Sequence, residues 1–225
     1  MNNTLLATLI LLILASDGVR ATDAAHSAAL APDVPAGTYV LDKSHASLLF
    51  RVDHLGFSNY TARFKRFDAT LDFDPGNPAA ASVVATVDAR SLETDYPFPD
   101  QLDFNAQLEG PDWLDAGAHP QLTFRSTRVV PNGADTARID GELTLRGVTR
   151  PMALQATFNG GYAGHPMDPH ARIGFSARGS LLRSAYGMTT GIPAPGSKMG
   201  VSDAVDVVIE VEFSGPPLQK STAAD

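Results

Sequence analysis

The feature of this sequence that most constrains its fold is an alternation of apolar and polar residues with a period of two. It is clearest in residues 204–215, where Val205, Val207 and Ile209 alternate with acidic residues such as Asp206. Because successive side chains of a β-strand point to opposite faces, such a stretch gathers its apolar side chains on one face. Strands with one apolar and one charged face are typical of antiparallel sheets.

The same alternation recurs along most of the chain. Nine segments show it, with turn-forming Gly, Pro, Asn and Asp residues between them: 37–42, 46–54, 61–73, 82–90, 122–130, 138–147, 151–160, 171–182 and 204–215. Many short strands at even spacing predict a sandwich or a barrel. Several of the segments are about ten residues long, or ~33 Å as strands, and this length favours the barrel.

One stretch interrupts the strands. Residues 98–120 lack the alternation, and Leu102, Ala106 and Leu108 would share one face of a helix there. We therefore expect one or two short helices between the strands of an all-β domain.

The interior of such a barrel is either filled by side chains or open to one small ligand. Several inward positions near the middle of the strands are small, namely Ala62, Ala85, Gly141, Ala156, Ala177 and Gly179. Small residues between large apolar ones would leave an apolar slot for a lipid-like guest. A long aromatic side chain from another strand, Trp113 included, would instead fill the gap. This pattern alone leaves both interpretations open.

The first residues predict export. Residues 5–15 form an apolar run, and the small residues Val19 and Ala21 that follow are typical of a signal-peptidase site. We therefore expect a signal peptide at 1–21 and a periplasmic or secreted protein. The run is shorter than the roughly 18 apolar residues that a membrane span needs, so we expect no stable membrane insertion after cleavage.

The rest of the chain is predicted to form one domain. We expect a loose leader at 22–37, the barrel domain at 38–214 and a disordered tail at 215–225. The absence of cysteine excludes disulfides and thiol catalysis. A net charge of −8 without basic clusters argues against nucleic acid as a partner. A homodimer is left open.

The histidines raise the question of a metal or catalytic site. His45 and His54 are nine residues apart on one expected strand, or roughly 30 Å, which is too far to share a metal ion. Ser44 and His45 are neighbours on a strand, so we expect their side chains to point to opposite faces and form no catalytic dyad. No G-x-S-x-G motif is present. We therefore predict no catalytic residue, no metal and no cofactor.

Two residues remain as candidate contacts for a polar group in the interior. His54 shares the parity of the apolar residues before it, which places it inward near the end of its strand. Arg183 follows another expected strand and would either meet a polar head group or pair with Asp203, and we favour the pair. The loop histidines of "HPMDPH", 165–170, suit a divalent metal only weakly.

Seven stretches in one order resemble a known family. They are "YVLDKSHASLLFRVDHLGFSN", "RFKRFDATLDFDP", "SVVATVDARSLET", "PDWLDAGAHPQLTFRST", "GELTLRGVTRPMAL", "IGFSARGSLLRSAYGM" and "VSDAVDVVIEVEF". Together they resemble the YceI-like family of bacterial, mostly periplasmic, lipid-binding proteins over residues 38–213. The resemblance implies an eight-stranded antiparallel, lipocalin-like barrel around an apolar tunnel that holds a polyisoprenoid or an isoprenoid quinone. It implies no catalytic centre.

One stretch departs from the family pattern. Many members carry an Asp and a His-Leu pair on the helical segment, where this chain has Asn105 and then Gln107 before Leu108. A role of that histidine in holding a head group is therefore not expected here.

We predict a barrel that sequesters or carries an isoprenoid-type lipid. The predicted cavity wall consists of Leu48, Phe50, Val52, Phe64, Phe73, Phe124, Leu143, Phe175 and Ile209, with Trp113, His54 and Arg183 as lid or head-group contacts. Burial of an apolar chain contributes roughly 25 cal/mol per Å² without any covalent chemistry. The alternatives are a solid barrel that acts as an interaction or stress-response module without a ligand, and an enzyme that acts on a bound lipid.

Overall fold

The computed structural model describes residues 34–218. Its strands are β1 (Gly37–His54), β2 (Ser58–Phe64), β3 (Phe67–Phe73), β4 (Ser82–Asp88), β5 (Leu92–Glu93), β6 (Gln121–Pro131), β7 (Thr136–Leu145), β8 (Val148–Tyr162), β9 (His170–Leu182) and β10 (Val201–Pro217). The helical elements are α1 (Phe104–Glu109) and the 3₁₀ turns η2 (Pro78–Ala80), η3 (Ala89–Ser91) and η4 (Arg183–Tyr186).

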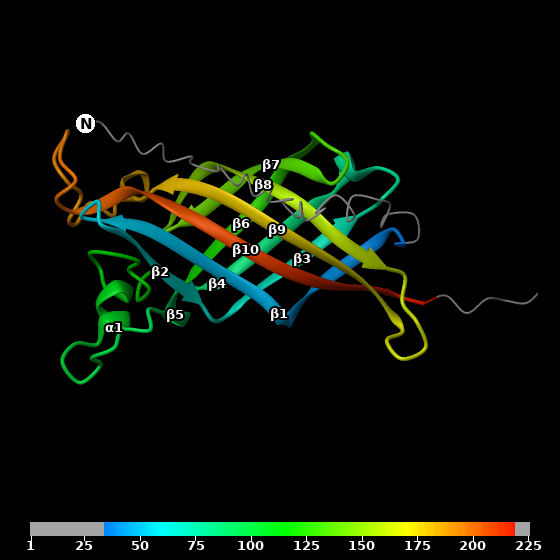
Figure 1. The fold of residues 1–225 in the computed structure, drawn as a ribbon, viewed down its shortest axis with the longest axis horizontal. Coiled ribbons are helices and arrows are strands. Elements are labelled where there is room, and N and C mark those ends of the chain that lie inside the picture. The colour runs from blue at the N-terminus through cyan, green and yellow to red at the C-terminus, as the bar shows by residue number, and fades with distance from the viewer. Residues whose placement is uncertain (1–33, 219–225) are drawn as a thin grey trace, which may run out of the picture.

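The strands form a closed antiparallel barrel (Figure 1). Neighbours follow the order β10-β9-β8-β7-β6-β4-β3-β1, and β10 pairs with β1 to close it. β2 and β3 lie end to end along β1, so they occupy one position in the barrel. The two-residue β5 is added to the edge of β2. The barrel thus has eight strand positions, which confirms the predicted fold class.

The alternation in the sequence matches the two faces of the barrel wall. In β1, Leu48, Phe50 and Val52 pair with Ile209, Val207 and Val205 of β10, and all six side chains face the interior. Apolar cross-strand pairs of this kind stabilise a sheet. The register of β1 against β10 shifts between Leu41 and Ala46, so the residues between them form a bulge in the strand.

The limits of the barrel differ slightly from the expected ones. β1 begins at Gly37 and β10 ends at Pro217, one residue before and three residues after the expected domain of 38–214. Val34 is only 4% exposed, and the Tyr39 hydroxyl donates to the Pro35 carbonyl oxygen at 2.6 Å, so the chain just before β1 packs on the barrel. The predicted signal peptide lies outside the described residues, as do most of the predicted leader and tail.

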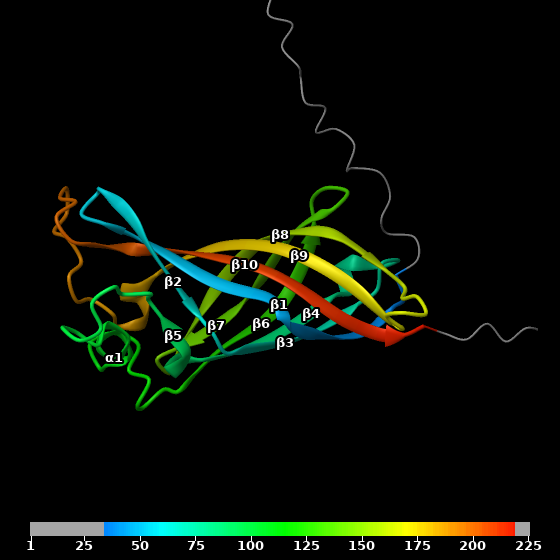
Figure 2. The same ribbon diagram turned by 60° about the horizontal axis from the view of Figure 1, so that its bottom comes forward.

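The segment between β5 and β6 carries α1 at one end of the barrel, which we call the α1 end (Figure 2). The Asp103 carboxylate caps this helix by accepting from the Ala106 N–H at 2.9 Å. The Asn105 side chain oxygen accepts from the Thr94 N–H at 3.0 Å and from its hydroxyl at 2.6 Å, which fixes α1 to the end of β5. The helix begins after Leu102, so the expectation that Leu102 shares a helix face is wrong, and its side chain is 39% exposed.

The α1 end also carries the β1–β2 turn and the long connection from η4 to β10 (Figures 1 and 2). The opposite end carries the β3–β4, β6–β7 and β8–β9 connections, and we call it the β3–β4 end. Within residues 34–218, no helix combines the length and the apolar character that a membrane crossing requires.

Candidate functional site

An apolar cavity of about 670 Å³ runs inside the barrel between its two ends. All nine predicted wall residues line it: Leu48, Phe50, Val52, Phe64, Phe73, Phe124, Leu143, Phe175 and Ile209. Trp113, His54 and Arg183 line it too. The structure therefore brings the predicted set together around one space, and contact of these residues with a ligand stays a prediction.

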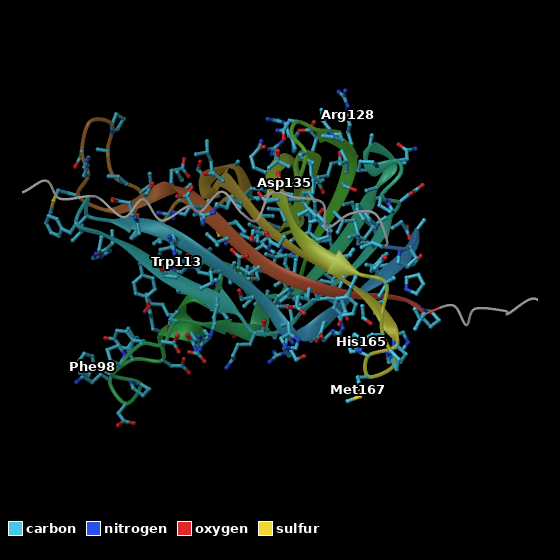
Figure 3. All side chains as sticks on the ribbon, turned by 45° about the vertical axis from the view of Figure 1, so that its right-hand side comes forward. Phe98, Trp113, Arg128, Asp135, His165 and Met167 are labelled. Atoms are coloured by element: carbon cyan, nitrogen blue, oxygen red, sulfur yellow. The ribbon has the colours of Figure 1, made fainter. Side chains whose placement is uncertain are left out.

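Ala62 is buried in the core and does not line the cavity, so the expectation of open space beside it is wrong. The other five small inward residues divide into two groups. Ala156 and Ala177, like Ala85, line the cavity. At Gly141, by contrast, an added Cβ atom would lie 2.4 Å from Cζ of Phe124, and at Gly179 it would lie 2.7 Å from a methyl carbon of Leu154. Neighbouring side chains thus fill the space beside the glycines, whereas the alanines leave it open. Trp113 does not fill the middle of the barrel, because it lies at the α1 end (Figure 3).

Aromatic rings dominate the cavity near the β3–β4 end. The rings of Phe73, Phe158 and Phe175 lie within 5.4–6.2 Å of one another, centre to centre, and Phe213 lies 6.3 Å from Phe175. Such contacts add to the hydrophobic gain from burial. Asp135, in the β6–β7 connection, lines the cavity at this end and is exposed (Figure 3).

The polar residues at the α1 end centre on Arg183. Its side chain is 3% exposed, and its three nitrogens donate to the carbonyl oxygens of Ser202 at 2.9 Å, Val201 at 2.8 Å and Met188 at 3.1 Å. The guanidinium carbon lies 5.2 Å from the centre of the Trp113 ring, which is cation–π geometry.

The expected ion pair between Arg183 and Asp203 is wrong. The carboxylate of Asp203 accepts instead from the N–H of Ser184 at 2.8 Å and from its hydroxyl at 2.7 Å. Burial lowers the pKa of Arg183, and the more distant charge of Asp203 opposes this shift. The sequence places Arg183 and Asp203 at neighbouring strand ends. It does not reveal that backbone carbonyl oxygens accept the hydrogen bonds of the guanidinium.

His54 is the last residue of β1 and is exposed at the mouth of the cavity. It lies opposite Val201 in the β1–β10 register, next to the carbonyl groups that Arg183 contacts. His45 lies in the bulge of β1 on the outer surface, so the structure does not bring the two histidines together.

The prediction that Ser44 and His45 diverge is also wrong. The bulge breaks the alternation, and the Ser44 hydroxyl lies 3.2 Å from Nδ1 of His45. Both groups contact Asp42, with the hydroxyl at 2.5 Å and the imidazole at 3.0 Å, and His45 Nδ1 is 3.9 Å from a carboxylate oxygen of Glu212. These contacts hold Asp42 ionised, because they keep the pKa of its carboxyl group well below the usual range. The cluster lies outside the cavity.

A network of ion pairs joins this cluster to the β8–β9 loop. Arg172 on β9 contacts Asp42 and also donates through Nε to Asp168 at 2.9 Å, and Asp168 accepts from the Tyr162 hydroxyl at 2.6 Å. The carboxylate of the "HPMDPH" loop is thus engaged by an arginine. This arrangement ties the loop to the barrel wall.

Sequence reasoning missed an aromatic chain at the α1 end. Phe98, 53% exposed, contacts Tyr96, which contacts Phe104, which contacts Tyr60, with ring centres 5.4–5.9 Å apart. Tyr96, Phe104 and Tyr60 line the cavity, so the chain leads from the exposed Phe98 (Figure 3) to the interior. The "YPF" triplet in an otherwise polar loop was the available signal.

Comparison with known proteins gives a consistent result. A sequence model described as a YceI-like domain matches residues 39–213. A UPF0312 protein of Vibrio cholerae is 36% identical over 179 residues, which cover 79% of this chain and 87% of that protein. The protein YceI of Escherichia coli is 37% identical over 182 residues, covering 79% of this chain and 86% of its own length.

Solved structures show the same fold. Burkholderia cenocepacia BcnA superposes with a TM-score of 0.63 at 24% identity, covering 76% of this chain and 98% of that one. A domain from Saccharophagus degradans, described as polyisoprenoid binding, superposes with a TM-score of 0.57 at 15% identity, covering 79% and 98%. At these identities the likeness concerns the fold.

Proposed function

The chain belongs to the YceI-like family, and on this premise we propose that it binds a polyisoprenoid or isoprenoid quinone in the barrel cavity and sequesters or carries it. The observation that carries the proposal is the apolar cavity of about 670 Å³, a size within the range of small-molecule sites. The Saccharophagus domain, whose description names polyisoprenoid binding, supports the ligand class. We also propose, from the predicted signal peptide at 1–21, that the protein is exported.

The physical basis of binding would be the removal of a long apolar chain from water. The cavity runs along the strands and is lined mostly by aliphatic and aromatic side chains, so its shape suits an extended chain. Each Å² of apolar surface buried contributes roughly 25 cal/mol before ordering costs. No covalent or metal chemistry is required.

The two other functions have less support. An enzyme acting on the bound lipid needs an acid and a base that converge on one point. Among the described residues that line the cavity, one arginine and one carboxylate are present. They are Arg183 and Asp135, and they lie toward opposite ends of the barrel. A solid interaction barrel would lack the open space beside Ala156 and Ala177.

The test is native mass spectrometry of protein purified without detergent, followed by solvent extraction of what is bound. We expect a stoichiometric isoprenoid lipid in the wild type. Phe50→Asp, which places a charge in the wall, should lose it, while Thr61→Asp, on the exposed face of neighbouring β2, should retain it. A wild-type protein that is empty and takes up no added isoprenoid would refute the proposal.

A further inference from the structure

Arg183 is a buried cation whose nearest acid, Asp203, acts on it only from a distance. Among the described residues, no carboxylate lies within 4.0 Å of its guanidinium, although the side chain is 3% exposed. Three of its five N–H groups donate to carbonyl oxygens, and the other two have no acceptor in the described part of the chain. Burial of a charge is costly unless an opposite charge or further hydrogen bonds compensate it.

The guanidinium lies where the cavity reaches the α1 end. It lines the cavity together with Trp113, whose ring it overlies, and with His54, which is level with its acceptor Val201. The indole N–H of Trp113 makes no hydrogen bond within residues 34–218, and because no buried side-chain nitrogen in that range lacks a partner, this N–H is open to solvent or to a ligand. The guanidinium therefore presents two N–H groups without a protein acceptor at this end of an otherwise apolar space.

The other end of the cavity has the opposite character. Asp135 directly precedes Thr136 of β7. Thr136 pairs with Thr157 of β8, which pairs in turn with Ser176 of β9. Ser176 lies seven residues before Arg183, or roughly 20 Å along a strand. The carboxylate of Asp135 would repel an anion, and the phenylalanine cluster around Phe175 accepts only apolar groups.

We propose that Arg183 and Trp113 form a head-group subsite for an anionic lipid, one with a phosphate or carboxylate head and a long apolar chain. The head lies against the guanidinium at the α1 end, and the chain runs through the barrel toward the phenylalanine cluster. This inference rests on the proposed lipid-binding function and adds to it the charge of the ligand and its direction in the barrel.

A pair of ligands that differ only in the head group tests the charge. We expect the wild-type protein to bind decaprenyl monophosphate at least about tenfold more tightly than decaprenol, since a charge-assisted hydrogen bond in a buried site supports a difference of this size. Arg183→Gln should remove the preference and leave decaprenol binding in place. Arg150→Gln is the matched control, because Arg150 is exposed and contacts the same η4 turn at the Ala185 carbonyl from outside.

Equal wild-type affinities for the two ligands would overturn the inference and leave the proposed function intact. An equal loss of both ligands in Arg183→Gln would also overturn it, because the arginine would then serve only the fold. Failure of the wild type to bind either ligand would overturn this inference, and failure to bind an added isoprenoid quinone as well would overturn the lipid-binding function itself.

The direction of the ligand is testable in the wild-type protein, which avoids any folding defect of the variants. Trp113 is the one tryptophan of the sequence and reports on the α1 end by its fluorescence. A stearate with a nitroxide beside the carboxylate should quench it more strongly than a stearate with the nitroxide at the methyl end. Stronger quenching by the methyl-end probe would reverse the proposed direction and refute the subsite.

Discussion

Ala156 of β8 and Ala177 of β9 are cross-strand neighbours in the same register position, and both side chains line the cavity. This opposed pair of small residues keeps the middle of the barrel open. Gly141 is just as small, but the ring of Phe124 covers it. The two kinds of position should therefore respond differently to an added side chain.

Ala177→Leu should project into the cavity, so we expect reduced lipid binding and a smaller change in the free energy of unfolding than the about 1–3 kcal/mol of an overpacked site. Gly141→Ala should clash with the Phe124 ring and with the Arg125 carbonyl oxygen, which would be 2.6 Å away. We expect that change to cost about 1–3 kcal/mol. Urea denaturation and lipid extraction of both variants provide the measurement, and equal effects on stability would contradict the assignment of open and filled positions.

Arg172→Met should destabilise the protein by about 1–3 kcal/mol, because it leaves Asp42 and Asp168 without their shared partner. Arg138→Gln, which breaks a more exposed pair with Asp140, should cost less than about 1 kcal/mol. Urea denaturation at pH 7 compares the two variants. If Arg172→Met costs no more than Arg138→Gln, the network does not hold the loop to the barrel.

The Asp42 cluster should make stability depend on pH at acid values. Hydrogen bonds from Ser44 and His45 lower the pKa of the Asp42 carboxyl group in the folded protein. As the pH falls, Asp42 is therefore protonated in the unfolded state before it is protonated in the folded state. The resulting stabilisation is present above the unfolded pKa, about 3.9, and is lost as the pH falls below it. The free energy of unfolding of Asp42→Asn should thus fall less steeply than that of the wild type between about pH 5 and pH 2.

His45 acts in the opposite direction. Its hydrogen bond to Asp42 and the charge of Glu212 raise its pKa in the folded protein. Its contribution is present below the unfolded pKa of about 6.5 and is lost as the pH rises through the folded value. His45→Gln should therefore flatten the stability profile above about pH 6.5, and an unchanged profile in this variant would show that the imidazole contributes nothing.

Asn105 offers a test of how α1 is held. Its amide oxygen serves Thr94, while its amide nitrogen donates to Glu93 at 3.2 Å. Asn105→Asp keeps the acceptor but places a carboxylate beside Glu93, so we expect faster hydrogen exchange in α1 at neutral pH. Hydrogen bonds from Lys65 and the Asn105 amide lower the pKa of Glu93 to about 2, so loss of the amide donor in this variant should raise that pKa. Exchange as slow as in the wild type would mean that these contacts do not anchor the helix.

The sequence predicted the barrel and its wall for a clear physical reason. Alternate residues of each strand, such as Phe50 and Ile209, must face the interior, and the apolar pattern with a period of two shows which residues these are. What it could not reveal depends on breaks in that period. The bulge at 42–45 brings Ser44 to His45 against the alternation. The carbonyl groups around Arg183 come from Met188, in the loop after η4, and from the start of β10, and no local pattern encodes their approach.

The pairing of Leu48 with Ile209 joins positions 161 residues apart in the chain. Pairing between strands so far apart in the chain is slow, because a long loop must be closed before the contacts form. The β10–β1 pairing is the one that closes the sheet, and without β10 the remaining strands β9 to β1 would have two open edges and would not enclose the cavity. β10 is the last strand to be synthesised and also the strand that closes the barrel. A chain truncated before residue 201 would therefore lack an enclosed cavity.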